Sequence, residues 1–255
     1  MIYLLLGGIC AYLSSCAGLG GSTLLRPLLD AVSPLSPSSI AAISTISALG
    51  AALVCAFFML SSPLALHQDE LILLSVGGAL GGFVGDLLSS RFYSVLGPAG
   101  ALLLQNALLF TLLALPAVYF SVLSRTLQPL TLTRLAALPV SILLGLFSSF
   151  LAFGAQPLTL AVYYLLFDAE HEEASCAAVT IALSALAAKL ITLLIRQRFS
   201  IASPEVLLWL LPGVLLGVFL SVFPALRVRQ KGLSDTIIRL SLFTAMINIV
   251  AALAR

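Results

Sequence analysis

The sequence predicts an all-α, polytopic integral membrane protein. Of its 255 residues, 61% are hydrophobic and only 9% are charged. A soluble domain carries about 25% charged residues, which cover its water-facing surface. Apolar runs of membrane-spanning length also recur along the whole chain, with short polar stretches between them. Because helices satisfy their own backbone hydrogen bonds, they are the expected way for such runs to lie in lipid.

About eight hydrophobic segments follow one another. A transmembrane helix needs ~20 mostly apolar residues. The first stretch begins at residue 2, and no basic residue precedes it. We therefore expect residues 2–17 to belong to the membrane domain rather than to a cleavable signal. The other segments lie at 36–61, 71–90, 101–122, 133–151, 172–195, 203–222 and 234–254.

Two of these segments contain residues that interrupt helices. The first is broken by Gly18-Leu19-Gly20-Gly21-Ser22, and the fifth continues toward Phe167 through Ala152-Phe153-Gly154-Ala155-Gln156-Pro157. In a helix interior, glycine costs about 1 kcal/mol and proline about 3 kcal/mol relative to alanine. We predict that the backbone is discontinuous at both places.

The two breaks belong to a pattern that repeats at a nearly constant offset. Gly20 and Gly154 lie 134 residues apart, and the segment 41–44 resembles 177–180 at an offset of 136. These matches predict two repeats, residues 1–125 and 126–255, which together form one membrane domain. Repeats with equivalent broken helices are typical of secondary transporters. The repeats are parallel if each broken segment crosses the membrane and inverted if it is re-entrant, and the distribution of Lys and Arg does not decide between these.

The residues at the breaks resemble the sulfite exporter TauE/SafE family of bacterial membrane transporters. Gly18-Leu19-Gly20-Gly21-Ser22, followed by Pro27, is similar to the family's first glycine-rich turn and its trailing proline. Gly154 with Pro157-Leu158 is similar to its second turn. Ser22 replaces the last glycine of the first turn, and Ala152, Ala155 and Gln156 replace glycine or proline in the second.

This resemblance covers essentially the whole chain and implies a function. It implies a multi-pass protein of the bacterial inner membrane that transports a sulfur-containing anion such as sulfite, thiosulfate or a sulfonate, and that is not an enzyme. The substrate would bind between the two glycine-rich breaks, near the membrane midplane.

Helix ends inside a membrane can bind an anion. A helix N-terminus presents unpaired N–H groups and the positive end of the helix dipole, and glycine lets a solute approach the backbone. Alternatively, the small residues only allow helices to cross closely. The candidate substrate-binding residues at the first break are Gly20, Gly21, Ser22 and Thr23, and those at the second are Gly154, Ala155, Gln156 and Thr159.

Further candidates lie in the segments that follow the breaks. Ser44 and Thr180 occupy equivalent positions of the two repeats, and they either line the path or bond to their own helix. Lys189 lies inside a hydrophobic segment on the same helical face as Ala185, so it is a functional candidate. Snorkelling toward the interface at Arg196 is its alternative role.

The remaining polar residues are expected to stabilise the helices. Arg26 has the spacing to pair with Asp30 within a helix, and its alternative role is to attract an anion toward the site. Asp86 and Arg91 have the spacing of a pair at the end of a helix. Three amides are expected to form hydrogen bonds between helices. They are Gln105, Asn106 and Asn248.

The leading functional hypothesis is a secondary carrier for a small anion. No phosphate-binding loop for ATP is present, so a proton or sodium gradient could drive transport. The cysteines form no metal-ligand spacing, and we expect no metal, no cofactor and no nucleic-acid partner. Whether the chain forms a homo-oligomer is left open. The alternatives are an intramembrane thiol-redox carrier, in which Cys16 and Cys176 would meet, and a structural subunit of a membrane complex.

Overall fold

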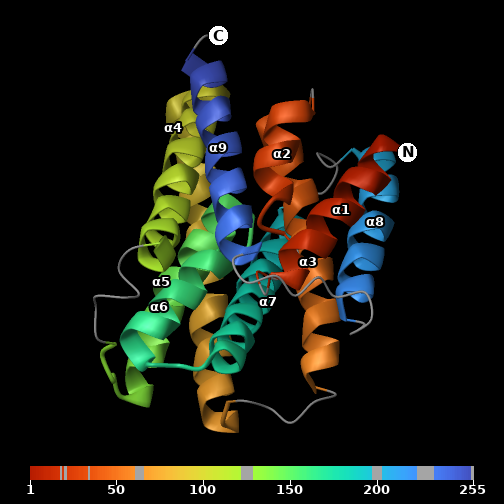
Figure 1. Ribbon diagram of the computed structural model, residues 1–255. Helices are drawn as coiled ribbons and strands as arrows, with labels where there is room; N and C mark the ends of the chain where they lie inside the picture. The colour runs from red at the N-terminus through yellow and green to blue at the C-terminus, as the bar shows by residue number, and fades with distance from the viewer. Residues whose placement is uncertain are drawn as a thin grey trace.

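The structure is a computed structural model that describes residues 1–17, 19, 22–33, 35–60, 66–121, 129–196, 203–222 and 233–253. Every regular element in these residues is a helix, which confirms the predicted class (Figure 1). In chain order the helices are α1 (Ile2–Cys16), α2 (Leu25–Val32), α3 (Pro37–Leu60), α4 (Gln68–Ser121), the 3₁₀ turn η2 (Arg134–Ala136), α5 (Ala137–Leu151), α6 (Gln156–Phe167), α7 (His171–Ile195), α8 (Pro204–Val222) and α9 (Leu233–Leu253).

Six of the described spans are long and apolar enough to cross a membrane. They are Pro37–Met59, Gln68–Gly97, Gly100–Phe120, Arg134–Leu151, His171–Ile195 and Pro204–Val222. Two of them are arms of α4, which meet at Gly97. Gly97 has φ +71° and ψ 176°, a conformation that glycine adopts easily, and it precedes a proline, which disfavours helical ψ values.

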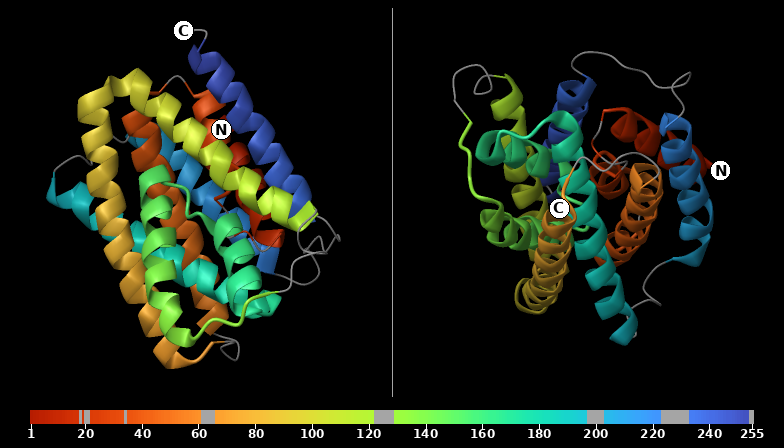
Figure 2. Two further views of the ribbon diagram at one scale, coloured as in Figure 1. Left: turned by 90° about the vertical axis from the view of Figure 1, so that its left-hand side faces the viewer. Right: turned by 90° about the horizontal axis from the view of Figure 1, so that it is seen from below.

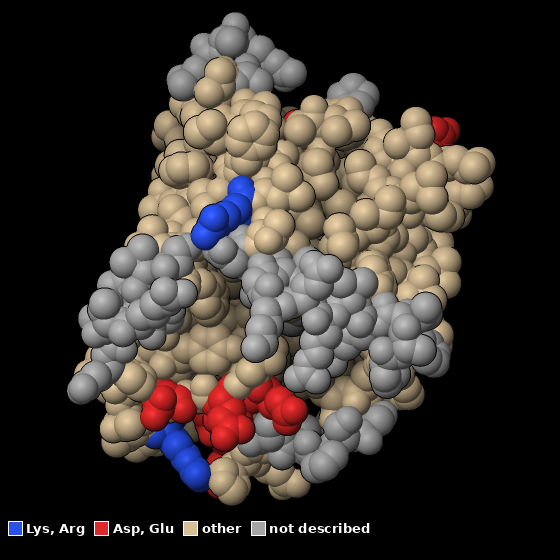
Figure 3. All heavy atoms as spheres, in the orientation of Figure 1, with Lys and Arg blue, Asp and Glu red and all other residues tan. Residues whose placement is uncertain are grey.

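The outer surface of the bundle is apolar. Phe57, Leu208 and Ile195 are 67%, 70% and 75% exposed. The face shown in Figure 3 is mostly uncharged, with acidic side chains gathered at its lower end. An exterior of this kind is suited to lipid rather than to water.

Helices α5 and α6 form a hairpin around the second break. Just before α5, Leu130 N–H donates to Leu165 O at 2.7 Å, and Leu132 N–H donates to Leu166 O at 2.9 Å. Because Leu165 and Leu166 lie at the end of α6, the hairpin begins and ends on the same side of the molecule. The break is its tip.

Helices α1 and α2 also run back from their break toward one end of the molecule. In Figure 1 both run upward from the break, whereas α5 and α6 run downward from theirs. The two hairpins therefore open toward opposite ends, and their tips lie in the middle of the bundle.

Each hairpin packs against helices that are distant in sequence. Helix α1 packs along α8, and α5 packs along the first arm of α4 (Figures 1 and 2). Glycines make these crossings close: a Cβ added to Gly217 would lie 2.3 Å from Gly8 O, and one added to Gly145 would lie 2.6 Å from Gly78 O. Neither position tolerates a side chain without moving a backbone.

Candidate functional site

The second break is a short stretch of left-handed backbone between α5 and α6. Ala152 and Ala155 have φ values of +55° and +45°, and Gly154 has φ +86°. The predicted discontinuity is confirmed, because α5 ends at Leu151 and α6 begins at Gln156. Left-handed conformations cost a residue with a Cβ about 1–2 kcal/mol, so the surrounding packing must hold this turn in place.

The first break is confirmed as well, since α1 ends at Cys16 and α2 begins at Leu25. Gly20 and Gly21, two of the predicted site residues, lie outside the described residues. The start of both breaks has the same backbone hydrogen bond. Leu19 N–H donates to Ser14 O at 2.8 Å, and Phe153 N–H donates to Ser148 O at 3.4 Å.

The tips of the two hairpins touch. Ser22 Oγ donates a hydrogen bond to Phe153 O at 2.9 Å and lies 3.3 Å from Gln156 Oε1. All three residues are buried. The amide nitrogen Nε2 of Gln156 is buried and has no hydrogen-bond partner among the described residues. The start of α6 therefore presents an unused side-chain donor where the hairpins meet.

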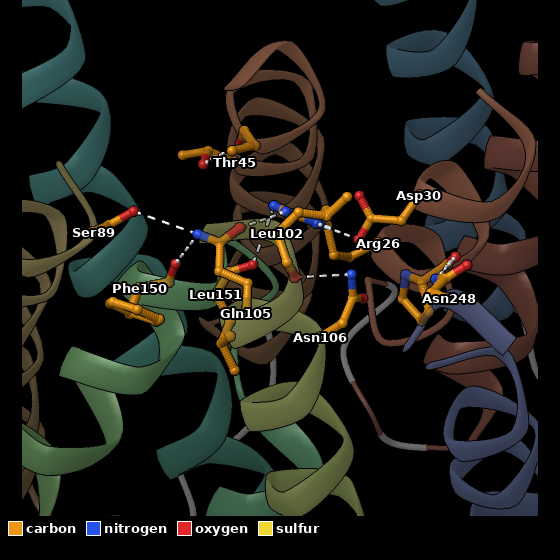
Figure 4. Close-up of polar contacts among 12 residues, drawn as sticks. Arg26, Asp30, Thr45, Ser89, Leu102, Gln105, Asn106, Phe150, Leu151 and Asn248 are labelled. Carbon is orange, nitrogen blue, oxygen red and sulfur yellow. Dashed lines mark hydrogen bonds and ion pairs between the residues drawn. The ribbon is translucent and has the colours of Figure 1, made fainter. Parts of the chain in front are cut away.

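Three side chains from three other helices cover the carbonyl end of α5. The last carbonyls of a helix have no partner within the helix, and they lie at the negative end of its dipole. Lys189 donates to Ser149 O. Gln105 Nε2 donates to Phe150 O at 3.4 Å, and Arg26 Nη1 donates to Leu151 O at 3.3 Å (Figure 4). Two cationic side chains, Lys189 and Arg26, therefore lie beside the last carbonyl groups of α5, where the break begins.

Arg26 is fully buried and organises the polar contacts of Figure 4. Its Nε lies 3.0 Å from Asp30 Oδ2, as the sequence predicted, and its Nη2 donates to Gln105 Oε1 at 3.1 Å. Tyr93 Oη donates to the same Gln105 oxygen at 2.9 Å. Arg26 therefore links α2, α4 and α5 through side-chain and backbone oxygens.

Lys189 faces the interior of the bundle and does not snorkel. Its side chain is 3% exposed and bonds to Ser149 O. No carboxylate of the described residues lies within 4.0 Å of its amine, whereas Arg26 has Asp30. Of these two cations, only Arg26 is closely paired with a carboxylate, whereas Lys189 is held by a backbone carbonyl.

The predicted pair of Asp86 and Arg91 is wrong. Asp86 Oδ2 instead lies 3.8 Å from Arg196 and accepts a hydrogen bond from Thr192 at 2.8 Å. Both partners are on α7, which packs against α4. Spacing within one helix did not reveal this contact between helices.

The hydroxyl candidates fall into two groups. Thr23, Thr159 and Thr180 each bond to the carbonyl four residues earlier, at 3.1, 3.1 and 2.8 Å. Ser44 Oγ, by contrast, is buried and has no partner among the described residues, so its hydroxyl is free to donate to a solute.

The three amides differ in their partners. Gln105 bonds to other helices, and Asn248 Nδ2 donates to Pro27 O at 2.9 Å, as expected. The prediction for Asn106 is wrong, because its amide bonds to Leu102 O in its own helix at 3.1 Å. The Oδ1 atom of Asn106 has no partner among the described residues.

The family model for the sulfite exporter TauE/SafE matches residues 3–252. The chain belongs to the TauE/SafE family. It is therefore a multi-pass membrane transporter and not an enzyme. No curated protein and no solved structure gives a significant match.

This TauE/SafE protein has four free cysteines, and Cys16 and Cys176 are buried and unpaired. No group of three His, Cys, Asp or Glu side chains in the described segments could hold a metal ion.

A separate polar cavity of about 250 Å³ lies toward the acidic end of this TauE/SafE chain. Its ionisable lining includes His67, Glu70, Arg134 and Glu173. Glu170 and Glu173 also form the capping box that begins α7. Nothing in the sequence indicated a cavity here.

Proposed function

We propose that the chain is a secondary carrier for a small sulfur-containing anion, such as sulfite, thiosulfate or a sulfonate. The anion binds where the tips of the two hairpins meet. Gln156 Nε2 and Ser44 Oγ supply free donors, since both are buried without a partner among the described residues. From the sequence we assign Gly20, Gly21 and Ser22 to the first half of the site.

The contact of Ser22 with Phe153 and Gln156 carries this proposal. It brings the first break against the start of α6, where the helix dipole favours negative charge. Gln156 Nε2 is a buried donor that an anion oxygen can satisfy, and leaving such a group unpaired costs about 1–3 kcal/mol. Binding recovers that free energy.

Positive charge supports the choice of an anion. Lys189 and Arg26 contact carbonyls two residues apart at the end of α5, and only Arg26 has a carboxylate within ion-pair distance among the described residues. In a low-dielectric interior, the positive charge of Lys189 interacts strongly with an anion. A bound anion with one or two negative charges compensates this positive charge.

We infer further that residues 1–125 and 126–255 are inverted repeats. The order of hairpin and long helices in α1–α4 recurs in α5–α9, and the hairpins open toward opposite ends. Alternating access would then be a rocking of the two repeats around the hairpin tips.

Counterflow in proteoliposomes tests the proposal. Purified protein is reconstituted into vesicles loaded with unlabelled thiosulfate, sulfite or a sulfonate, and uptake of the labelled anion is measured. We expect exchange of at least one of these anions and none of a neutral solute such as glycerol. Absence of exchange for all three would reject the proposed substrate class, and equal uptake of glycerol would reject a selective carrier.

A further inference from the structure

Only one of the two carboxylate oxygens of Asp30 has a partner among the described residues. Its Oδ2 lies 3.0 Å from Arg26 Nε, and its side chain is 3% exposed. Its Oδ1 is buried and has no partner among the described residues. A buried carboxylate oxygen normally accepts a hydrogen bond or carries a proton, because an unsatisfied charge in a low-dielectric interior is costly.

A second unpartnered oxygen lies in the same place. Asn106 Oδ1 is also buried without a partner, and Asn106 and Asp30 line one gap together with Arg26, Gln105 and Leu151. This gap is too small for a water molecule. Two unpartnered acceptors in a space without room for water call for a donor that occupies almost no volume.

We propose that Asp30 is the proton-binding site that couples transport to the proton gradient. The proton binds to Oδ1 and forms a neutral carboxylic acid. A sodium ion is a poorer fit, since a dehydrated metal cation needs about six oxygen ligands and only two acceptors here are unpartnered. This inference rests on the proposed function.

Arg26 connects the proton to the anion. While Asp30 is ionised, it compensates the charge of Arg26, whose Nη1 also reaches Leu151 at the second break. Protonation removes that compensation, so the guanidinium attracts an anion at the hairpin tips more strongly. By linkage, the bound anion favours the protonated carboxyl to the same extent, and proton and anion move together.

The other titratable groups near this pair are on neighbouring helices. Tyr93 on α4 shares Gln105 Oε1 with Arg26. Lys189 on α7 contacts Ser149, two residues before the carbonyl that Arg26 contacts. Helix α9 contributes the neutral amide of Asn248 to Pro27 O. Among these described groups, Asp30 is the only acid with a free oxygen.

Transport driven by a pH gradient tests the coupling. Thiosulfate is a suitable probe because it stays ionised over the working pH range. We expect an acidic exterior to raise its accumulation about tenfold in the wild-type protein, a coupling of ordinary size. Asp30→Asn should keep counterflow and lose this accumulation, whereas the matched variant Asp86→Asn should keep both.

The outcomes separate the two proposals. If the wild-type protein exchanges none of the three anions, the proposed function fails. If it exchanges them but a pH gradient drives no accumulation, or still drives it in Asp30→Asn, the coupling role of Asp30 is overturned.

An infrared titration of purified protein needs no substrate and covers the case in which Asp30→Asn fails to fold. We expect the carbonyl band of a buried, protonated carboxylic acid to respond to pH in the wild-type protein and in Asp86→Asn. The band should shift in Asp30→Glu, which keeps the acid. An unchanged band in Asp30→Glu would show that the acid is elsewhere and would overturn the inference.

Discussion

Ser22 Oγ and the carbonyl oxygen of Phe153 are 131 residues apart in sequence and form a 2.9 Å hydrogen bond. This contact joins the tips of two hairpins that enter the bundle from opposite ends. It places the first break beside the N-terminus of α6, where the helix dipole favours an anion. Five predictions follow from this arrangement.

Gly154→Leu should abolish transport and leave membrane insertion intact. Gly154 has φ +86°, and a Cβ there would lie 3.2 Å from the Gln156 side chain, so the variant strains the break and displaces a donor. Gly97→Leu is the matched control, because Gly97 also has positive φ but nothing lies within 4 Å of its Cβ position. Both variants should lose stability by about 1–3 kcal/mol. Transport by Gly154→Leu at wild-type rates would exclude the second break from the site.

Gln156→Glu should weaken anion binding by about ten- to hundredfold, measured as the KM for thiosulfate uptake. The substitution replaces an unpartnered donor with a negative charge at the start of α6. Gln68→Glu introduces the same charge at the exposed start of α4 and should leave KM unchanged. Equal KM values for the two variants would contradict a role for Gln156 in binding.

Lys189→Met should raise the KM for the anion by about tenfold or more, since it removes a buried cation that has no carboxylate of the described residues within 4.0 Å. The fold should persist, because an apolar side chain of similar length replaces a desolvated charge. Arg196→Met, at the end of the same helix, removes a side chain that is 32% exposed and should change KM little. A normal KM for Lys189→Met would show that the anion does not sense this charge.

Arg26→Ala should lower the free energy of unfolding by about 3–5 kcal/mol, because it leaves Asp30 buried without its partner. The double variant Arg26→Met with Asp30→Asn removes both charges and should recover most of this loss. Thermal unfolding in detergent provides the measurement. If the single and double variants are equally unstable, the ion pair is not the source of the effect.

The hairpins should be accessible from opposite sides of the membrane. In a chain whose four cysteines are replaced by alanine, Ser38→Cys after α2 and Thr131→Cys before α5 place single thiols at exposed positions. A membrane-impermeant maleimide added to intact cells should label one of the two, and inside-out vesicles should reverse the result. Labelling of both from the same side would contradict inverted repeats.

Much of the fold could be predicted from the sequence, because lipid imposes simple rules. Apolar runs of sufficient length must be helices, and glycine and proline inside them mark breaks. Both breaks were located correctly. That Arg26 pairs with Asp30 was also predictable, since side chains four residues apart on a helix are neighbours.

The contacts between helices could not be predicted in the same way. Asp86 bonds to Thr192 and Arg196 on another helix, and no local spacing signals that partner. The same holds for Lys189, which bonds to the carbonyl of Ser149. Every residue has a backbone carbonyl, so the residue type does not indicate which carbonyl accepts this bond. Only the packing of α7 against α5 reveals it.

The packing of α1 along α8 has a consequence for how the chain is made. Helix α1 leaves the ribosome well before α8, which begins only at residue 204. At about 5–20 residues per second, α1 waits roughly 10 to 40 s for the helix whose glycines it contacts. During that time lipid, a chaperone or the insertion machinery must shield its close-packing face, so biogenesis of this protein should depend more on such assistance than that of a bundle built from neighbouring helices.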